Sequence, residues 1–144
     1  MKSWIGTLTC LVYLCSAAIF PVLAGDQEEA AKAAREILMS IQQRQFEKLW
    51  DTQTSTFFKE KMTRDSFMAN LSLGRQQLGA PGESKFVDMA YSQFDSTTEY
   101  RGEIYAFNYL NTYSAGKFYE RIVVIKEPDG KFRLSGLWGS PGPK

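Results

Sequence analysis

The segment 103–138 constrains the fold more than any other part of the sequence, because it contains three strand-like stretches separated by tight turns. The turns lie at residues 114–116 and 127–130 and are rich in Gly, Pro, Ser and Asp, which favour chain reversals. The middle stretch, 118–126, is apolar on both faces over residues 122–125, as in an interior strand that is covered on both sides. We therefore expect an antiparallel sheet around this stretch.

Further segments with period-two alternation supply the neighbours of this strand. Residues 86–94 alternate apolar with small or polar side chains, and the segments 104–110 and 132–138 also alternate. Aromatic residues dominate one face of the segment 104–110, namely Tyr105, Phe107 and Tyr109. In the last strand, one predicted face carries Phe132, Leu134, Gly136 and Trp138.

The N-terminal half is predicted to be helical. Residues 26–43 repeat apolar side chains at helical spacing, and residues 46–62 continue helically with a break expected at 52–56, where Ser and Thr compete for backbone hydrogen bonds. Thr63 is suited to cap a third helix and Gly79 to end it. Helices followed by four consecutive strands indicate an α+β domain, in which N-terminal helices pack on a curved four-stranded antiparallel sheet. This arrangement forms a cone, and a cone often contains a pocket.

Residues 1–24 have the features of a signal peptide. Lys2 provides a short positive region, the apolar stretch that follows carries no charge, and Ala24 ends a sequence of small residues suited to cleavage. A membrane anchor is the alternative, because the stretch is near the ~20 residues that a span needs, but Ser, Thr and Pro dilute it. We expect cleavage after Ala24 or nearby, a single domain over residues 26–139, a flexible tail at 140–144, and a periplasmic or secreted location.

The composition excludes several classes of function. Cys10 and Cys15 both lie in the predicted leader, neither follows a lipoprotein cleavage sequence, and the chain contains no histidine. The exported domain therefore lacks disulfides, thiol nucleophiles and the commonest metal ligands, and we expect no cofactor and no metal. Loss of Lys2 with the leader takes one of 17 basic residues and leaves 16 against 16 acidic ones. This balance predicts neither nucleic-acid binding nor attachment to an anionic membrane surface.

Several short motifs follow one another along the chain. They are residues 46–50, 57–59, Arg75 with Leu78 and Gly79, Tyr105, Phe107, Thr112, Glu120, Glu127 with 129–131, and Gly136. Their order is similar to that of a family of small exported bacterial proteins, domain of unknown function four thousand and nineteen, over nearly all of the exported chain. The resemblance implies a cone fold like that of nuclear transport factor 2 and the cystatins, and it implies no activity. The chain departs from the family at Phe67 and Phe132, where members tend to carry Trp.

Arg75 and Glu120 form the sharpest predicted constellation. Glu120 shares a strand face with Phe118, Ile122 and Val124, so its carboxylate is directed where apolar residues point and needs a partner. Arg75 lies on the inward side of the third helix and could supply a bidentate partner. Two interpretations stay open: a polar spot inside the cone that orients a ligand, or a helix-to-sheet salt bridge that only supports the fold.

Aromatic and acidic residues supply the other candidates. Tyr105, Tyr109 and Trp138 each have an apolar body and a polar tip, so they could line the mouth of a pocket or else pack across strands. The predicted ligand site therefore comprises Arg75, Glu120, Tyr105, Tyr109 and Trp138. Asp88 or Glu120 could act as an inward general base, as in cone-fold isomerases and dehydratases, although no histidine accompanies them.

Three functions of different class are compatible with these features. The first, which we favour, is a non-catalytic exported module that binds a small molecule or a protein of the cell envelope. The second is a cone-fold isomerase or dehydratase that uses an inward carboxylate. The third is a structural homodimer, whose two-fold interface would form, if no helix covers it, from Tyr119, Arg121, Val123 and Ile125.

Overall fold

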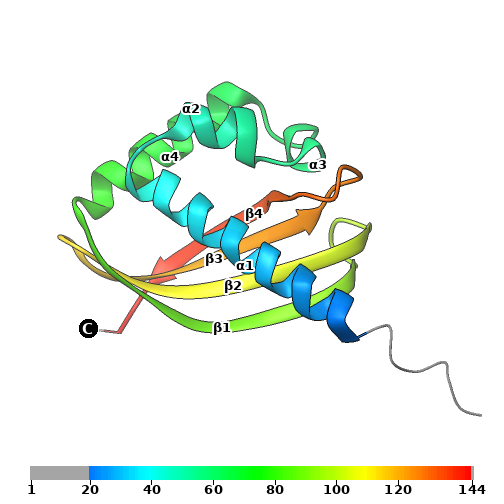
Figure 1. The fold of residues 1–144 in the computed structure, drawn as a ribbon. Helices are drawn as coiled ribbons and strands as arrows, with labels where there is room; N and C mark the ends of the chain where they lie inside the picture. Colours follow the sequence, from blue (N-terminus) through cyan, green and yellow to red (C-terminus); the bar gives the residue numbers. More distant parts are fainter. Residues whose placement is uncertain (1–19, 144) are drawn as a thin grey trace, which may run out of the picture.

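The computed structural model describes residues 20–143, and all of its helices precede its strands in the chain. Figure 1 shows a curved sheet with the helices gathered on its concave side. The helices are α1 (Phe20–Gln42), α2 (Phe46–Lys48), the π-helical turn η1 (Leu49–Gln53), α3 (Thr56–Lys59) and α4 (Arg64–Leu78). The strands are β1 (Pro81–Asp95), β2 (Tyr100–Tyr113), β3 (Gly116–Lys126) and β4 (Phe132–Pro141).

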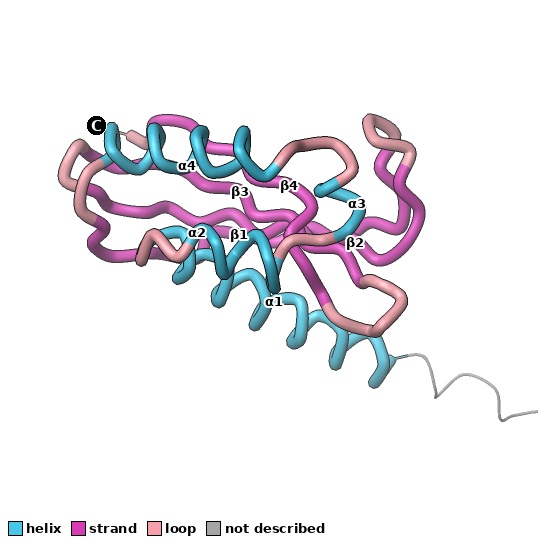
Figure 2. Tube along the Cα trace, turned by 90° about the horizontal axis from the view of Figure 1, so that it is seen from above, coloured by secondary structure: helices cyan, strands magenta, loops and turns pink. Residues whose placement is uncertain are grey.

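The sheet is an open antiparallel meander in the order β1-β2-β3-β4. Seen from above the helical layer, α4 runs along the β4 side while α1 crosses obliquely on the other side (Figure 2). This arrangement confirms the predicted α+β class, with helices packed on one face of a four-stranded antiparallel sheet. Within residues 20–143, none of the helices combines the length and the apolar character needed to cross a membrane.

The predicted signal peptide lies largely outside the described residues. The described residues begin with Phe20, and the predicted cleavage point after Ala24 falls within the backbone of α1. The opposite end of the chain differs from the expectation, because β4 continues to Pro141 and pairs Ser140 with Tyr119 and Pro141 with Phe118. The first two residues of the predicted flexible tail are therefore part of the sheet.

Side-chain hydrogen bonds set the helix boundaries at the predicted places. Thr63 caps α4, its hydroxyl accepting the backbone N–H of Ser66 at 3.3 Å, and Gly79 ends the helix with a φ of +80°, a region that favours glycine. The expected break in the second helical segment lies at Thr54 and Ser55, between η1 and α3. There, the hydroxyl of Thr54 donates to the carbonyl of Leu49 at 2.9 Å and so competes with the regular helical pattern.

The break also covers one edge of the sheet. Thr54 forms a parallel bridge with Leu134 of β4, and the N–H of Ser55 donates to the carbonyl of Leu134 at 2.9 Å. The Ser55 hydroxyl then caps α3 by accepting the N–H of Phe58 at 3.1 Å. The edge of β4 is therefore partly occupied by the chain itself, whereas β1 forms the other edge of the sheet.

The main core lies between α1 and the concave face of the sheet. Four small or aliphatic residues follow one side of α1 and are inaccessible to solvent: Ala30, Ala34, Ile37 and Ile41. They meet the aromatic face of β2 and the aliphatic residues of β3 and β4: Tyr105, Phe107, Tyr109, Ile122, Val124 and Leu134. Each large apolar side chain buried in this way contributes about 1.5–3 kcal/mol, so this layer holds helices and sheet together.

A bulge in β4 corrects one expectation from the sequence. The register shifts between Val123 and Val124 of β3, because Val124 pairs with Leu134 while Val123 pairs with Gly136, which leaves Ser135 as an extra residue. The bulge moves Gly136 and Trp138 to the face opposite that of Leu134. The prediction that the alternating residues of β4 share one face was therefore wrong beyond Ser135.

Candidate functional site

A groove of about 620 Å³ lies on the face of the sheet that carries no helix. Ile104 and Ala106 of β2 and Val123 and Ile125 of β3 form its floor. They alternate along their strands with the core residues, so they point away from the helices. These four side chains are nevertheless buried, because the neighbouring rings, including that of Phe57 from α3, pack around them. The groove therefore has a deep aliphatic floor.

The turn between β1 and β2 forms one wall of the groove. Asp95 organises this turn, because one carboxylate oxygen accepts the N–H of Thr97 at 2.9 Å and the other accepts the hydroxyl of Thr98 at 2.8 Å. The Thr98 hydroxyl, followed by the Thr97 N–H, lowers the pKa of Asp95. Glu99 completes the reversal with a φ of +59°. Asp95 thus stays ionised and mainly supports the wall.

Two aromatic rings continue this wall. The ring of Tyr100 packs edge-on against Phe57 with 4.9 Å between centroids, and it lies over Gly102, where an added Cβ would come within 2.9 Å of the Tyr100 hydroxyl. The Arg101 guanidinium lies 4.5 Å from the centroid of the Phe94 ring, a cation–π contact. Both rings are therefore fixed by neighbours.

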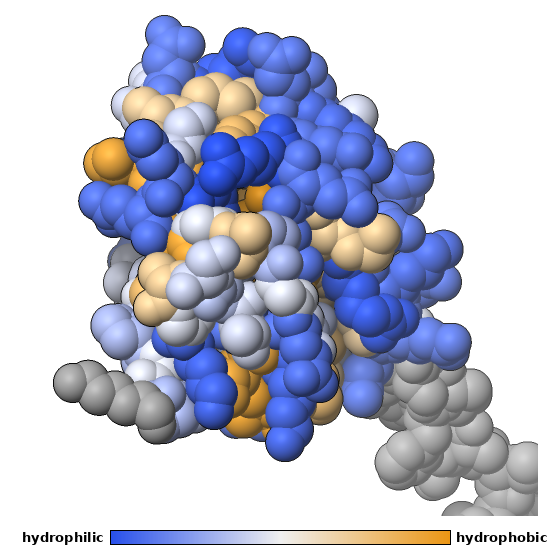
Figure 3. Space-filling view, turned by 90° about the vertical axis from the view of Figure 1, so that its left-hand side faces the viewer, coloured by the Kyte–Doolittle hydropathy of each residue, from blue (hydrophilic) through white to orange (hydrophobic). Residues whose placement is uncertain are grey.

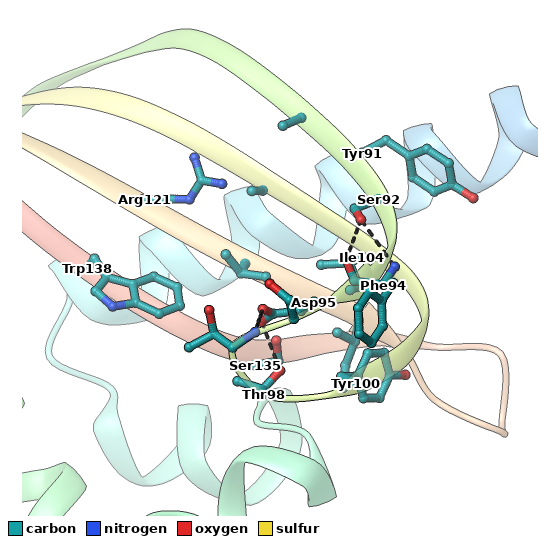
Figure 4. Close-up of a pocket in the computed structure, with 16 residues that line it drawn as sticks. Tyr91, Ser92, Phe94, Asp95, Thr98, Tyr100, Ile104, Arg121, Ser135 and Trp138 are labelled. Carbon is teal, nitrogen blue, oxygen red and sulfur yellow. Dashed lines mark hydrogen bonds between the residues drawn. The ribbon is translucent and has the colours of Figure 1, made fainter.

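The opposite wall combines an indole with a guanidinium. The ring of Trp138 covers Gly136, where an added Cβ would meet the ring at 2.2 Å, and it remains 58% exposed. The Arg121 guanidinium donates to the Asn108 side-chain oxygen at 3.5 Å, and the Asn108 amide in turn donates to Asp88. Figure 4 shows Arg121 and Trp138 on one side of the groove and the residues of the hairpin on the other.

This arrangement suits an amphipathic ligand. The floor offers only aliphatic contacts, the rings of Trp138 and Phe94 offer flat apolar surfaces, and Arg121 places a positive charge at the rim. Tyr91 also borders the groove, but Figure 4 shows its ring turned away from the other labelled side chains, and it packs against Tyr105 on the helix-covered face at 4.8 Å. Among residues 20–143, no group of acidic side chains is arranged to hold a metal ion.

The structure brings Arg75 and Glu120 together in a buried network. Arg75 donates to one oxygen of Glu120, while the other oxygen accepts the amide of Asn111 at 2.6 Å and the hydroxyl of Tyr113 at 2.5 Å. Arg75 also donates to the Tyr113 hydroxyl at 2.6 Å. Burial and the neighbouring Glu120 carboxylate raise the pKa of Tyr113 well above its usual range. Both oxygens of Glu120 are therefore engaged by protein donors.

A smaller groove of about 270 Å³ runs beside this network, between α4 and the ends of β3 and β4. Gly74 opens one of its walls, and the ring of Phe118, stacked over Gly139, forms part of the other. Figure 3 views the end of the molecule where α4 meets the turn between β2 and β3. Hydrophilic residues cover most of the helical layer there, with smaller hydrophobic patches between them.

Of the other residues of the predicted ligand site, Trp138 joins Arg75 and Glu120 in the lining of the smaller groove, whereas Tyr105 and Tyr109 do not. Tyr105 and Tyr109 are only 2% and 5% exposed and pack within the main core. Trp138 borders the smaller groove as well as the larger one, since its position in β4 lies between the two. Asp88, considered as an inward base, is exposed and faces away from the helices beside Asn108.

Comparison with known protein families matches residues 33–137 to the family described as Protein of unknown function (DUF4019). The chain belongs to the DUF4019 family. This result confirms the resemblance inferred from the order of the short motifs. Neither the comparison with curated proteins nor that with solved structures finds a match.

In this DUF4019 protein, the matched span runs from α1 to β4 and includes Arg75, Glu120 and the whole groove floor. Sequence reasoning missed the groove and its hairpin wall. Asp95 followed by Ser and two Thr residues is a turn signal of the Asx type, and it could have located the wall. Arg121 was placed correctly on the opposite strand face, but Trp138 reaches this face only through the bulge at Ser135, which no local pattern announces.

Proposed function

We propose that this DUF4019 protein is an exported, non-catalytic binding module, and that the larger groove holds a small amphipathic molecule with an anionic group. The observation that supports the proposal most strongly is the pairing of a buried aliphatic floor with the Arg121 guanidinium at its rim. A volume of about 620 Å³ falls in the range of sites for small molecules, about 300–1,000 Å³.

The groove combines an apolar surface with a cationic group, and an amphipathic anion needs both. Ile104, Val123 and Ile125 offer an apolar bed for a hydrocarbon chain or ring, and Trp138 covers one side of it. Arg121 makes only one long hydrogen bond to a neighbour within residues 20–143, so most of its donors are available for a carboxylate. Charge-assisted hydrogen bonds of this kind are about twice as strong as neutral ones.

The interior of the domain supports binding by the outer groove rather than catalysis at an inward carboxylate. A general base needs an oxygen that faces its substrate, whereas both oxygens of Glu120 accept protein donors. The aromatic rings of Tyr105, Phe107 and Tyr109 fill the space between α1 and the sheet.

The helix-free face of the sheet has few exposed apolar residues for the interface of a two-fold homodimer. Val123 and Ile125 are only 9% and 2% exposed at the bottom of the groove, so a flat surface could not reach them. Of the four residues considered for such an interface, Tyr119 and Arg121 alone are exposed. A structural homodimer through this face is therefore a weaker proposal than a ligand.

Export and the finer fold class are parts of the same proposal. The leader sequence supports removal of residues 1–24 and a periplasmic or secreted location, and the helices on the concave side of the sheet support a cone like that of nuclear transport factor 2. Expression of the full chain in a bacterium, followed by mass spectrometry of the osmotic-shock fraction, tests export. We expect a product that starts near Gly25; a full-length mass in the cytoplasmic fraction would contradict export.

Titration calorimetry with dodecanoate, below its micellar concentration, tests the binding proposal. We expect saturable binding, with dodecyltrimethylammonium binding more weakly because its head group repels Arg121. Arg121→Gln should weaken dodecanoate binding about tenfold, the loss expected for one charge-assisted hydrogen bond, and leave the binding of the cationic probe unchanged or stronger. Trp138→Ala should weaken both probes.

Arg64→Gln is the matched control, since Arg64 is an exposed arginine of α4 outside the groove. It should leave both affinities unchanged. Equal affinities of Arg121→Gln and the unaltered protein for dodecanoate would contradict the assigned role of Arg121. The absence of any dodecanoate binding would contradict the amphipathic ligand itself.

A further inference from the structure

The smaller groove, between α4 and the ends of β3 and β4, has a buried ion pair in its lining. Arg75 and Glu120 are only 7% and 2% exposed, yet both border this groove. Within residues 20–143, the Arg75 guanidinium donates to Tyr113 through Nη1 and to Glu120 through Nη2. A guanidinium carries five N–H donors, so Nε and part of each Nη lack a protein acceptor there. Buried donors need an acceptor, and a ligand in the groove can supply one.

The ion pair favours an acceptor without charge. The Glu120 carboxylate lies against Arg75 and balances its charge, and the other residues that line the groove are uncharged. An anionic ligand would approach the Glu120 carboxylate in a poorly solvated place, where like charges repel strongly. A neutral carbonyl avoids this repulsion and still accepts an N–H of Arg75. In this respect the smaller groove differs from the larger one.

Gly74 keeps the groove open beside Arg75. It lies in the interior of α4, where only proline is less favourable than glycine. Packing does not require glycine at this point, because an added Cβ would meet nothing within 4 Å. Glycine also serves where a ligand must approach the backbone closely, and Gly74 borders the groove. The missing side chain therefore indicates a place for a ligand.

Two side-chain amides flank Gly74 on the same face of α4. Asn70 and Gln77 both line the groove and stand about 10 Å apart along the helix axis, a distance that an extended chain covers in about three residues. Each side-chain amide can donate to and accept from a peptide group. Across the groove, residues 137–139 of β4 lie beyond the bridge to Thr54 and pair with β3 alone in the described part of the chain. Their outer backbone groups can therefore bond to an extended peptide as well.

We propose that the smaller groove binds an uncharged, extended peptide segment of another protein, about three residues long, with an apolar side chain in the middle. The segment runs between α4 and β4, which follow each other in Figure 2. One of its carbonyl groups accepts an N–H of Arg75, and its apolar side chain enters between Leu71, Phe118 and Leu137. The volume of about 270 Å³ suits one such side chain with the peptide groups beside it.

Nuclear magnetic resonance with a short blocked peptide tests this site. We expect N-acetyl-Ala-Leu-Ala-amide to cause saturable shifts of the side-chain amide signals of Asn70 and Gln77 in ¹⁵N-labelled protein. Signals of Ile104 and Ile125 in the larger groove should not move. The same peptide with Asp in place of Leu should bind at least about tenfold more weakly, because it loses the burial of the apolar side chain. N-acetylglucosamine carries an acetamide without an apolar side chain and should cause no saturable shift.

Three variants locate the peptide. Gly74→Leu places a side chain in the groove and should abolish peptide binding, with an unchanged circular dichroism spectrum. Ser72→Leu is the matched control, since it adds the same side chain to α4 at an exposed position outside the groove and should leave the affinity unchanged. Asn70→Ala removes one neutral hydrogen bond and should weaken the peptide about fivefold. It tests the site independently if Gly74→Leu alters the fold.

Absence of saturable shifts at Asn70 and Gln77, or equal affinities for the Leu and Asp peptides, would overturn the proposal. Saturable shifts with N-acetylglucosamine but not with the Leu peptide would overturn it too, and would assign the groove to an amino sugar. Unchanged peptide affinity in both Gly74→Leu and Asn70→Ala would contradict the placement along α4. Dodecanoate binding by Gly74→Leu reports on the larger groove alone, so the two binding proposals can fail separately.

Discussion

Arg75 of α4 and Glu120 of β3 meet in a buried ion pair between segments 45 residues apart in the chain. Asn111 and Tyr113 of β2 both donate to the other oxygen of the carboxylate. The pair therefore ties the last helix to the two central strands by polar contacts rather than by apolar packing. A buried carboxylate with several donors is stable only while the whole set is present.

Removal of one partner should be costly. We expect Glu120→Ala to lower the free energy of unfolding by about 3–5 kcal/mol, because it leaves the Arg75 charge buried without a partner. Tyr113→Phe removes one donor and one acceptor from the network and should cost about 1–3 kcal/mol. Urea unfolding followed by circular dichroism measures both. As a control, Arg64→Ala breaks an exposed pair with Glu47 and should change stability by less than about 1 kcal/mol.

Gly74 should be replaceable with a gain in stability. It lies inside α4, where glycine costs about 0.8–1.0 kcal/mol relative to alanine, and an added Cβ would meet nothing within 4 Å. Gly74→Ala should therefore raise the free energy of unfolding by about 0.5–1 kcal/mol. The matched variant Gly79→Ala should do the reverse, because Gly79 has a φ of +80° and its Cβ would come within 3.0 Å of Ser114. Destabilisation by Gly74→Ala would show that the helix is packed more tightly at this point than the structure indicates.

Tyr105 should make the fold sensitive to alkali. Burial, and then the charge of Glu103, raises the pKa of Tyr105 from its ordinary value of 10.0 to about 12. Between pH 10 and 12 the unfolded chain therefore loses its phenolic proton while the folded chain keeps it, and stability falls as the pH rises. Between pH 9 and pH 11, the free energy of unfolding should fall by about 1 kcal/mol less in Tyr105→Phe than in the unaltered protein. Guanidinium unfolding at the two pH values measures this difference. An equal fall in the free energy of unfolding of both proteins would contradict this assignment.

Glu103 places a second carboxyl group beside the ion pair of Lys126 and Asp26. Lys126 binds both oxygens of Asp26 at 2.7 Å, and one buried oxygen of Glu103 has no hydrogen-bond partner in the described part of the chain. Burial, followed by the neighbouring Asp26, raises the pKa of Glu103. Ionised Glu103 therefore costs stability above that pKa, and the folded state gains stability as the pH falls toward the ordinary value of 4.5.

Glu103→Gln should accordingly raise the free energy of unfolding at pH 7 by up to about 1 kcal/mol and by less at pH 5. Urea unfolding at the two pH values measures this difference. A loss of stability at pH 7 would mean that the ionised Glu103 carboxylate helps to hold Lys126, which is incompatible with a raised pKa of Glu103.

The sequence predicted the order and type of the elements well. Thr63 and Gly79 bound α4 as expected, the Ser and Thr residues at 52–56 interrupt the second helical segment, and Glu120 needed a partner that Arg75 supplies. These features could be predicted because each depends on local hydrogen bonding or on the phase of a regular strand or helix.

The larger groove could not be predicted from the sequence in the same way. It depends on the extra residue at Ser135, which turns Trp138 to the helix-free face, and on a hairpin whose wall stands over Val123 and Ile125. Both are consequences of register and strand twist, which are tertiary properties. Tyr105 and Tyr109 were candidates for a pocket mouth because the depth of a ring below α1 cannot be read from its alternation along β2.

Nuclear magnetic resonance can show residue by residue whether the larger groove holds an amphipathic anion. Amide and indole N–H signals of ¹⁵N-labelled protein should be followed during titration with dodecanoate. We expect saturable shifts at Ile104, Val123, Ile125 and the indole of Trp138, and none at Asn70 or Gln77 beside the smaller groove. Shifts confined to Asn70 and Gln77, or no shifts at all, would contradict a ligand site in the larger groove.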